Sequence, residues 1–414
     1  MLVTLLLAAL PRPEPAMPKL ETKVLWEAFG QKSWDDFGRP VAFIDDIDGD
    51  GVQDALVGAV QDELDRDRSA EGSVRCLSGC DGRQLYVVYG GQADERLGAS
   101  LVSLDDVNAD GHRDFAAVTR SGVEMRSGAD GKKLRTLVAR TPGLPWGWGV
   151  FAAPDMDADG HQDVLVAIGE EPAMCATGMV IHPGCLILCS SRDGAVLRSI
   201  DGPDQGLGRF GHLGAVLPDR DGDGRPDLGV ASPFEGAIRI YSSTTGTLVT
   251  LLRSDDTWLG GALIDVGDAN GDGVRDLLVL ASTRDSSRRS SLRLASGRDG
   301  SELRSWGVEQ AGPGPQQPFA TLPDFDGDGV REVAVSEASY KSYRGRVLVL
   351  STRATRPIED ILGPKPGAIF GAGIAATDDL GGGLGPALLI GGVGDDRGVE
   401  DGGAVTLVLV HPAH

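Results

Sequence analysis

The sequence predicts an all-β protein, a seven-bladed β-propeller built from four-stranded antiparallel blades. A nine-residue acidic pattern recurs along the chain, and an apolar run follows each complete copy. The first residues of successive copies lie 60, 49, 64, 49, 56 and 54 positions apart, which is a period typical of propeller blades. Because a closed ring of blades forms one domain, this repeat overrides the two or three domains that 414 residues would otherwise suggest.

The acidic pattern is clearest in the segment Asp219-Arg-Asp-Gly-Asp-Gly224-Arg-Pro-Asp227. Alternate acidic side chains converge on one point only if the backbone curls around it, and Gly224 at position 6 permits that turn. A ring of hard carboxylate oxygens suits a hard cation, and the number and flexibility of the ligands favour Ca²⁺ over Mg²⁺. The pattern resembles the start of an EF-hand loop, but a short buried strand follows in place of a helix.

Six copies of the pattern are complete, and we predict that together they bind about six Ca²⁺ ions. The candidate ligands stand at positions 1, 3, 5 and 9 of each loop. They are Asp46, Asp48, Asp50 and Asp54; Asp106, Asn108, Asp110 and Asp114; Asp155, Asp157, Asp159 and Asp163; Asp219, Asp221, Asp223 and Asp227; Asp268, Asn270, Asp272 and Asp276; and Asp324, Asp326, Asp328 and Glu332. A seventh copy, around Asp378 to Pro386, has lost acidic side chains to glycine, and we expect no metal there.

The acidity of the chain is explained by these loops. The formal net charge is −22, and the six complete loops carry 22 carboxylates at their ligand positions. Six bound Ca²⁺ ions would leave a net charge of about −10. The charge therefore does not indicate a charged partner, and it argues against nucleic acid, which requires a basic face. We expect a monomer.

The fourth repeat illustrates the predicted blade. We expect strands over His212–Leu217, Leu228–Ser232, Ala237–Tyr241 and Leu248–Leu252, with the acidic loop between the first two. Four short strands separated by turn signals are typical of one propeller blade. The turn between the last two strands recurs in other repeats, as in Ser78 to Gly82, where Asp-Gly suits the positive φ angles of a tight hairpin. We assign the aspartates of these turns no metal role.

The two ends of the chain are expected to meet in the last blade. The seventh repeat ends with its third strand, Ala404 to Val410, whereas Lys23–Glu27 matches the pattern of a fourth strand. We therefore predict that this N-terminal strand closes the ring and protects the sheet edges, so that residues 21–414 form the propeller. Residues 1–20 are expected to be a signal peptide or a disordered leader, because their apolar run fits a signal-peptide core and is too short to span a membrane.

The five cysteines form no zinc-type pattern. Cys185 and Cys189 are expected on one strand, where residues four apart are separated by roughly 13 Å, too far for a disulfide. Cys175 either bridges to one of them across a hairpin or remains a buried free thiol, as the others do.

Dipeptides of an apolar residue and glycine precede the loops or the loop remnant at nearly constant spacing. They are Phe37-Gly38, Leu97-Gly98, Trp146-Gly147, Phe210-Gly211, Leu259-Gly260 and Phe370-Gly371. With Leu56-Val-Gly-Ala59 and Leu389-Ile-Gly-Gly392, these segments resemble FG-GAP (VCBS-like) repeats, as in the N-terminal β-propeller of integrin α subunits and in many secreted bacterial proteins. The resemblance runs from about residue 23 to the end of the chain. The sixth repeat departs from it, with Pro315-Gln-Gln-Pro318 in place of Phe-Gly.

The resemblance implies seven blades, Ca²⁺ between the first two strands of a blade, and a binding role. We expect no integrin-like receptor role, because the sequence shows no leg domain, inserted domain or membrane anchor. Calcium loops favour an exported protein, since weak sites fill at the Ca²⁺ concentrations found outside cells. We therefore predict a calcium-binding module that is secreted, periplasmic or on the cell surface.

The ligand of this module is expected to be a protein or a glycan, bound on the face opposite the calcium loops. Candidate contacts there are Trp34, Trp148, Trp258 and the segment Gln61 to Gly72. The alternative is that the tryptophans pack between blades and that the charged segment is a solvated loop. One alternative is an enzyme that acts on carbohydrates or phosphoesters, but the histidines do not cluster and no nucleophile motif occurs, so we predict no catalytic residues. The other alternative is a purely structural surface component.

Overall fold

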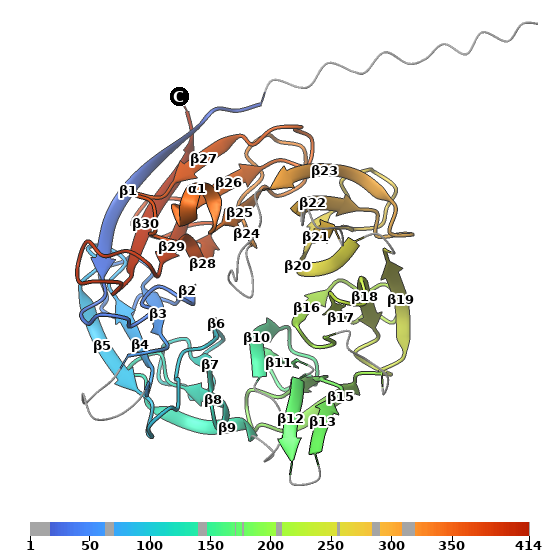
Figure 1. Ribbon diagram of the computed structural model, residues 1–414, viewed down its shortest axis with the longest axis horizontal. Helices are drawn as coiled ribbons and strands as arrows, with labels where there is room; N and C mark the ends of the chain where they lie inside the picture. Colours follow the sequence, from blue (N-terminus) through green and yellow to red (C-terminus); the bar gives the residue numbers. More distant parts are fainter. Residues whose placement is uncertain are drawn as a thin grey trace, which may run out of the picture.

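The computed structural model confirms an all-β, seven-bladed β-propeller, in which seven four-stranded antiparallel sheets form a ring (Figure 1). It describes residues 17–62, 70–139, 147–169, 171–175, 178–203, 209–254, 257–283, 290–308 and 319–413. Each sheet places its first strand nearest the centre of the ring and its fourth strand at the rim.

The first four blades follow the chain. They contain β2 (Val41–Phe43), β3 (Ala55–Ala59), β4 (Ser73–Leu77) and β5 (Gln84–Tyr89); β6 (Leu101–Ser103), β7 (Phe115–Thr119), β8 (Gly122–Arg126) and β9 (Lys133–Ala139); β10 (Gly147–Ala153), β11 (Asp163–Ile168), β14 (Cys185–Cys189) and β15 (Val196–Asp201); and β16 (Leu213–Leu217), β17 (Asp227–Ser232), β18 (Ala237–Tyr241) and β19 (Leu248–Arg253). The strands of the fourth blade agree with the predicted ones to within one residue at each end.

The other three blades complete the ring. They contain β20 (Thr257–Gly267), β21 (Asp276–Thr283), β22 (Ser290–Ala295) and β23 (Glu302–Val308); β24 (Phe319–Thr321), β25 (Val333–Glu337), β26 (Arg346–Leu350) and β27 (Glu359–Leu362); and β28 (Phe370–Thr377), β29 (Ala387–Gly392), β30 (Ala404–Pro412) and β1 (Leu20–Phe29). A one-turn helix, α1 (Tyr340–Tyr343), lies between β25 and β26. No helix in the described ranges is long and apolar enough to cross a membrane.

The core lies between neighbouring blades. The second strands are largely apolar, and β3, β7, β11, β17 and β25 are buried at every residue. This agrees with a strand covered on both faces, which carries a continuous apolar run instead of alternation. The outer strands do alternate, as in β19, where Leu252 is buried and its neighbours are not. The inner three strands therefore contribute most of the buried apolar surface, and the fourth strands add single residues such as Leu252 and Trp306.

The predicted closure of the ring by the N-terminal strand is confirmed. β1 pairs antiparallel with β30, from Leu20 opposite Pro412 to Phe29 opposite Ala404, with a bulge before Trp26. The strand is longer than the predicted Lys23–Glu27, because its first residue, Leu20, is also buried in the core. The indole Nε1 of Trp26 donates a 2.7 Å hydrogen bond to the carbonyl oxygen of Gly79, so the last blade is also fastened to the first.

The dipeptides of an apolar residue and glycine pack between blades, as the first two of them show. Phe37 is buried, and Gly38 has a φ of 107°. A Cβ on Gly38 would lie 2.6 Å from the carbonyl oxygen of Ala404 in the last blade, and a Cβ on Gly98 would lie 2.8 Å from that of Ser73 in the first. Only glycine therefore lets a blade begin against the third strand of the preceding blade. Trp146 and Pro315–Pro318 lie outside the described residues.

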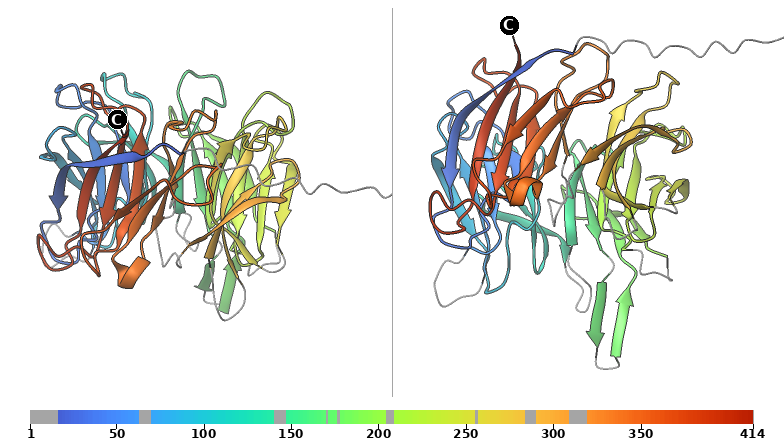
Figure 2. Two further views of the ribbon diagram at one scale, coloured as in Figure 1. Left: turned by 90° about the horizontal axis from the view of Figure 1, so that it is seen from above. Right: turned by 45° about the horizontal axis from the view of Figure 1, so that its top comes forward.

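A hairpin of β12 (Glu171–Cys175) and β13 (Gly178–His182) extends from the third blade on the same side of the ring as α1 (Figure 2). Its register places Cys175 opposite Gly178, at the far end of the hairpin. Cys185 begins β14, beyond the base of that hairpin, and Cys185 and Cys189 are free thiols among the described cysteine side chains. The side chain of Cys175, on which the predicted alternatives depend, lies outside what the structure describes.

Candidate metal centres

The six acidic loops connect the first and second strands of six blades, so the antiparallel topology places all of them at one end of the ring. Each loop turns through two residues with positive φ, at positions 4 and 6. Position 6 is always glycine, with φ between 82° at Gly273 and 94° at Gly160. Position 4 is glycine in four loops, but Ala109 and Ala158 hold it at φ values of 60° and 66°. The prediction that the position-6 glycine permits the turn is thus confirmed, and position 4 also requires a positive φ.

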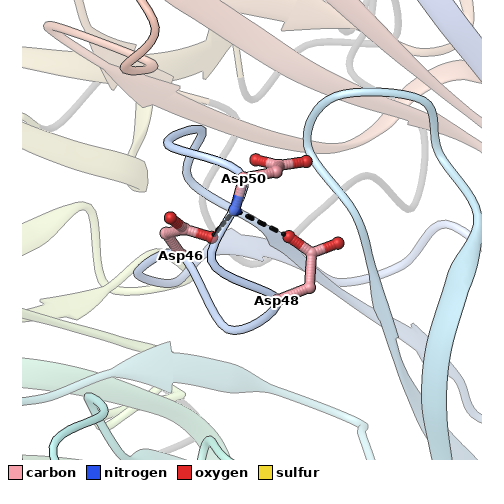
Figure 3. A group of neighbouring side chains, drawn as sticks. All are labelled: Asp46, Asp48 and Asp50. Carbon is pink, nitrogen blue, oxygen red and sulfur yellow. Dashed lines mark hydrogen bonds between the residues drawn. The ribbon is translucent and has the colours of Figure 1, made fainter.

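The carboxylate at position 1 organises the turn. In the first loop, Asp46 accepts hydrogen bonds from the backbone N–H groups of Gly49, Asp50 and Gly51, at 2.7, 3.0 and 2.7 Å. Figure 3 shows Asp46 and Asp48 on either side of the backbone nitrogen of Asp50, to which both are hydrogen-bonded. The N–H of the position-6 glycine is the main cause of the lowered pKa values of Asp155, Asp219 and Asp268 at position 1 of other loops.

The carboxyl group at position 9 has the opposite environment. All six of these residues are buried, with Asp54, Asp163 and Asp227 at 0% exposure. One oxygen of each accepts the backbone N–H of position 2, as in the 2.7 Å bond from Met156 to Asp163. Burial raises the pKa of Asp54 and Asp227 to about 6 and that of Asp163 and Glu332 to about 7. The other carboxylates of the loop add to the rise, against the lowering by N–H donors.

Carboxylate oxygens converge in four of the six loops. In each group, one oxygen of every residue lies within 4.8 Å of the others. The groups are Asp46, Asp48 and Asp50; Asp155, Asp157 and Asp163; Asp219, Asp221 and Asp227; and Asp324, Asp326 and Glu332. Oxygen atoms at that separation can share one cation of the size of Ca²⁺, whose ligands lie at about 2.3–2.6 Å.

The second and fifth loops carry asparagine at position 3. The side-chain amide of Asn108 donates to Asp110 at 2.8 Å, and that of Asn270 donates to Asp272 at 3.2 Å. In these two loops the amide nitrogen occupies the carboxylate that position 5 would offer to a metal. Binding there requires the amide to turn its oxygen inward, which the predicted ligand set assumes.

Two buried carboxylate oxygens without hydrogen-bond partners are compatible with a cation bound in the loops. The Oδ1 atoms of Asp163 and Asp227 have no hydrogen-bond partner among the described residues, although both side chains are fully buried. A buried, unpaired carboxylate oxygen is costly unless a cation or a donor satisfies it. Both residues belong to converging groups, so a cation held by the loop would remove that cost.

The serine at the start of the third-to-fourth turn supports the loops, which the sequence analysis missed. Ser78, Ser127 and Ser190 each donate from Oγ to the carboxylate at position 5 of their blade, at 3.2, 2.8 and 3.3 Å. Ser351 donates to Asp326 at position 3 instead, at 2.7 Å. The recurrence of serine at this turn is visible in the sequence, but by itself it indicates only a turn.

Acidic residues directly before two loops link neighbouring blades, and these residues were also missed. Asp45 accepts the backbone N–H of Arg113, at position 8 of the second loop, at 2.9 Å. Asp105 accepts that of Gln162, at position 8 of the third loop, at 3.1 Å. The first three loops are thus joined to one another, while the predicted ligand carboxylates stay available within each loop.

The candidate ligand contacts lie at the other end of the ring, where the second-to-third and fourth-to-first connections gather. Trp34 is 63% exposed there, which excludes packing between blades for this residue. Phe234 and Tyr343, on second-to-third connections, are 46% and 52% exposed. The side chains of Trp148 and Trp258 and residues 63–69 of the segment Gln61 to Gly72 lie outside what the structure describes.

A scan against protein-family models found no match to this chain, and a search among curated proteins found none either.

Proposed function

We propose that this protein is a calcium-binding β-propeller of the FG-GAP type that acts as an exported binding module. The observation that carries the proposal is the convergence of carboxylates in the acidic loops, together with the unpaired buried oxygens of Asp163 and Asp227. All available donors are oxygens, which favours Ca²⁺ over softer metals, and the loops are open enough to complete the coordination with water. The phenylalanine-glycine packing between blades is the second feature shared with that repeat family.

The proposed division of labour assigns calcium to one end of the ring and the ligand to the other. Metal ions fasten the first-to-second connections, so that the connections at the opposite end are held on a rigid scaffold. Trp34 supports a ligand surface there, because it is largely exposed and its φ of 67° is strained for a bulky residue. Asp94, with a φ of 60°, holds the corresponding place before the second blade. Where the second blade carries an aspartate, the first blade thus carries an exposed tryptophan, whose aromatic surface suits contact with a glycan ring or a protein side chain.

Metal analysis tests the calcium half of this proposal. The protein is stripped with EDTA, dialysed against buffer with millimolar Ca²⁺, and measured by isothermal titration calorimetry and atomic emission. We expect close to six Ca²⁺ per chain, with Mg²⁺ at the same concentration binding much more weakly. Two or fewer Ca²⁺ at saturation would contradict the assignment of the loops as metal sites.

A binding screen tests the ligand half. Glycans and candidate partner proteins are screened with and without Ca²⁺, and each hit is repeated with Trp34→Ala. We expect this variant to lose binding at an unchanged melting temperature, because the side chain is exposed. Val196→Ala is the matched control, since Val196 is 60% exposed on the outer strand of the third blade, away from the proposed surface. Equal binding by the wild type and Trp34→Ala would place the ligand site elsewhere.

A further inference from the structure

The turn between the third and fourth strands differs among blades at one residue. This residue follows the serine that recurs at the start of the turn. It is Gly79, Gly128 and Gly297 in the first, second and fifth blades, and Ser191 and Ser243 in the third and fourth.

Where the turn residue is glycine, it closes tightly on the acidic loop. A Cβ on Gly79, Gly128 or Gly297 would lie 1.9 Å from the carbonyl oxygen of the residue at position 8, so no other residue fits the same path. The close approach lets the N–H of the glycine reach the second oxygen of the position-9 carboxylate. These bonds run from Gly79 to Asp54 at 2.8 Å, from Gly128 to Asp114 at 3.3 Å and from Gly297 to Asp276 at 2.9 Å.

Where the turn residue is serine, that hydrogen bond is missing. The Oδ1 atoms of Asp163 and Asp227 are buried and have no partner within the described part of the chain. The hydroxyl oxygens of Ser191 and Ser243 are buried and equally without a described partner. A serine Cβ cannot take the glycine path, because the same carbonyl would obstruct it. We infer that the turn lies farther from the acidic loop, so that the backbone N–H of the serine does not reach the position-9 carboxylate.

We propose that this single turn residue divides the loops into two kinds. In the first, second and fifth loops, the backbone already satisfies the position-9 carboxylate, and the loop is complete without metal. In the third and fourth loops, the carboxylate keeps one oxygen for Ca²⁺, and the loop depends on the ion. This inference rests on the proposed calcium binding. The sixth loop pairs Thr352 with a longer Glu332, so it is outside the matched set.

Asparagine substitutions at position 9 test the two kinds of loop. Asp163→Asn and Asp227→Asn remove an unpaired buried charge, whereas Asp54→Asn and Asp114→Asn place an amide donor against the glycine N–H. In EDTA, we expect the first pair to melt at or above the temperature of the wild type. We expect the second pair to melt about 1–3 °C below it. In saturating Ca²⁺, Asp163→Asn and Asp227→Asn should each lose one bound ion by calorimetry.

Exchange of the turn residue supplies the second measurement. Ser191→Gly should raise the melting temperature in EDTA and shrink the shift that Ca²⁺ produces, and Gly128→Ser should do the reverse. A wild-type protein that binds no Ca²⁺ overturns the proposed function itself. If Ca²⁺ binds but Asp163→Asn and Asp114→Asn shift the metal-free melting temperature in the same direction, only the division of the loops is overturned.

Discussion

The seventh first-to-second-strand loop, from Asp378 to Pro386, keeps the glycines at positions 4 and 6 of the acidic loops but differs from those loops in the rest of its turn and in its chemistry. Gly382, at position 5, also has a positive φ, of 59°, where each acidic loop carries an aspartate that does not. Gly381 and Gly383 stand at positions 4 and 6 with φ values of 94° and 77°, close to the 77° and 88° of Gly49 and Gly51 in the first loop. Position 3, however, is Leu380, which is fully buried, where the acidic loops carry a polar ligand candidate. At this place in the seventh blade, the turn is therefore built around a side chain of the core.

Direct contacts with the neighbouring loops accompany this change. Leu380 accepts the backbone N–H of Gln53 from the first loop at 2.7 Å, and Val52 forms an antiparallel bridge with Gly381. On the other side, Arg331 of the sixth loop forms an ion pair with Asp378. The blade that joins the two ends of the chain is thus fastened by packing and backbone hydrogen bonds. The comparison indicates that closure of the ring rests on contacts that involve no metal, whereas the third and fourth acidic loops are the ones that we propose to depend on Ca²⁺.

Chelation should produce the largest effect. Without metal, each acidic loop holds three or four carboxylates close together, and their repulsion opposes folding. Bound Ca²⁺ stabilises the folded state by about 2.7 kcal/mol per site at a hundredfold excess over Kd, and six sites sum to many degrees in Tm. Melting curves in EDTA and in millimolar Ca²⁺ measure the difference. Superimposable curves would show that the acidic loops are ordinary turns, no different from the seventh.

Matched substitutions at position 3 distinguish stabilisation by core packing, in the seventh loop, from stabilisation by metal binding, in an acidic loop. Leu380→Ala removes a fully buried side chain and should cost about 2–5 kcal/mol, equally in EDTA and in Ca²⁺. Asp221→Ala, at the same position of the fourth loop, should cost a comparable amount only in Ca²⁺, because it removes a ligand. Urea unfolding in both buffers gives the four values. A cost of Leu380→Ala that changes with Ca²⁺ would contradict a metal-free closure.

The comparison also shows which features a sequence can predict. The spacing of Asp46 and its counterparts is a local pattern repeated along the chain, and it predicted the blades, the loops and the closing strand. The hydrogen bond to the buried carboxylate of Asp54 comes from the backbone N–H of Gly79, which lies 25 positions away and contacts Asp54 only in the folded blade. The exposure of Trp34 likewise depends on neighbouring blades. The local acidic pattern was therefore predictable from the sequence, whereas contacts between turns that are distant in the sequence could be identified only in the folded structure.

The acidic loops should give the metal-free protein an unusual pH dependence. Asp163 and Glu332 have folded pKa values of about 7, above the ordinary 3.8 and 4.5, so the native state binds more protons than the unfolded state between these limits. Stability in EDTA should therefore fall as pH rises from 5 to 8, by about 1–3 kcal/mol. In Ca²⁺ the slope should reverse, because protons compete with the ion.

Denaturant unfolding at pH 5 and pH 8, with and without Ca²⁺, measures both slopes. Asp163→Asn is the control, since it should flatten the slope in EDTA without affecting the seventh loop, which has no acidic residue at position 9. A metal-free protein that gains stability from pH 5 to pH 8 would mean that these carboxyl groups ionise freely in the folded loops.

The smallest expected effect concerns position 4, where the seventh loop and four acidic loops use glycine. Ala158 adopts a φ of 66° there, a left-handed conformation that costs an L-residue with a Cβ about 1–2 kcal/mol relative to its usual one. Ala158→Gly relieves this strain but gives the unfolded chain more freedom, so the net gain should be about 0.5–1 kcal/mol. The reverse change, Gly271→Ala in the fifth loop, should cost a similar amount. Urea unfolding in saturating Ca²⁺ compares the two, and a loss of stability in Ala158→Gly would show that the left-handed turn is not a strain on the acidic loops.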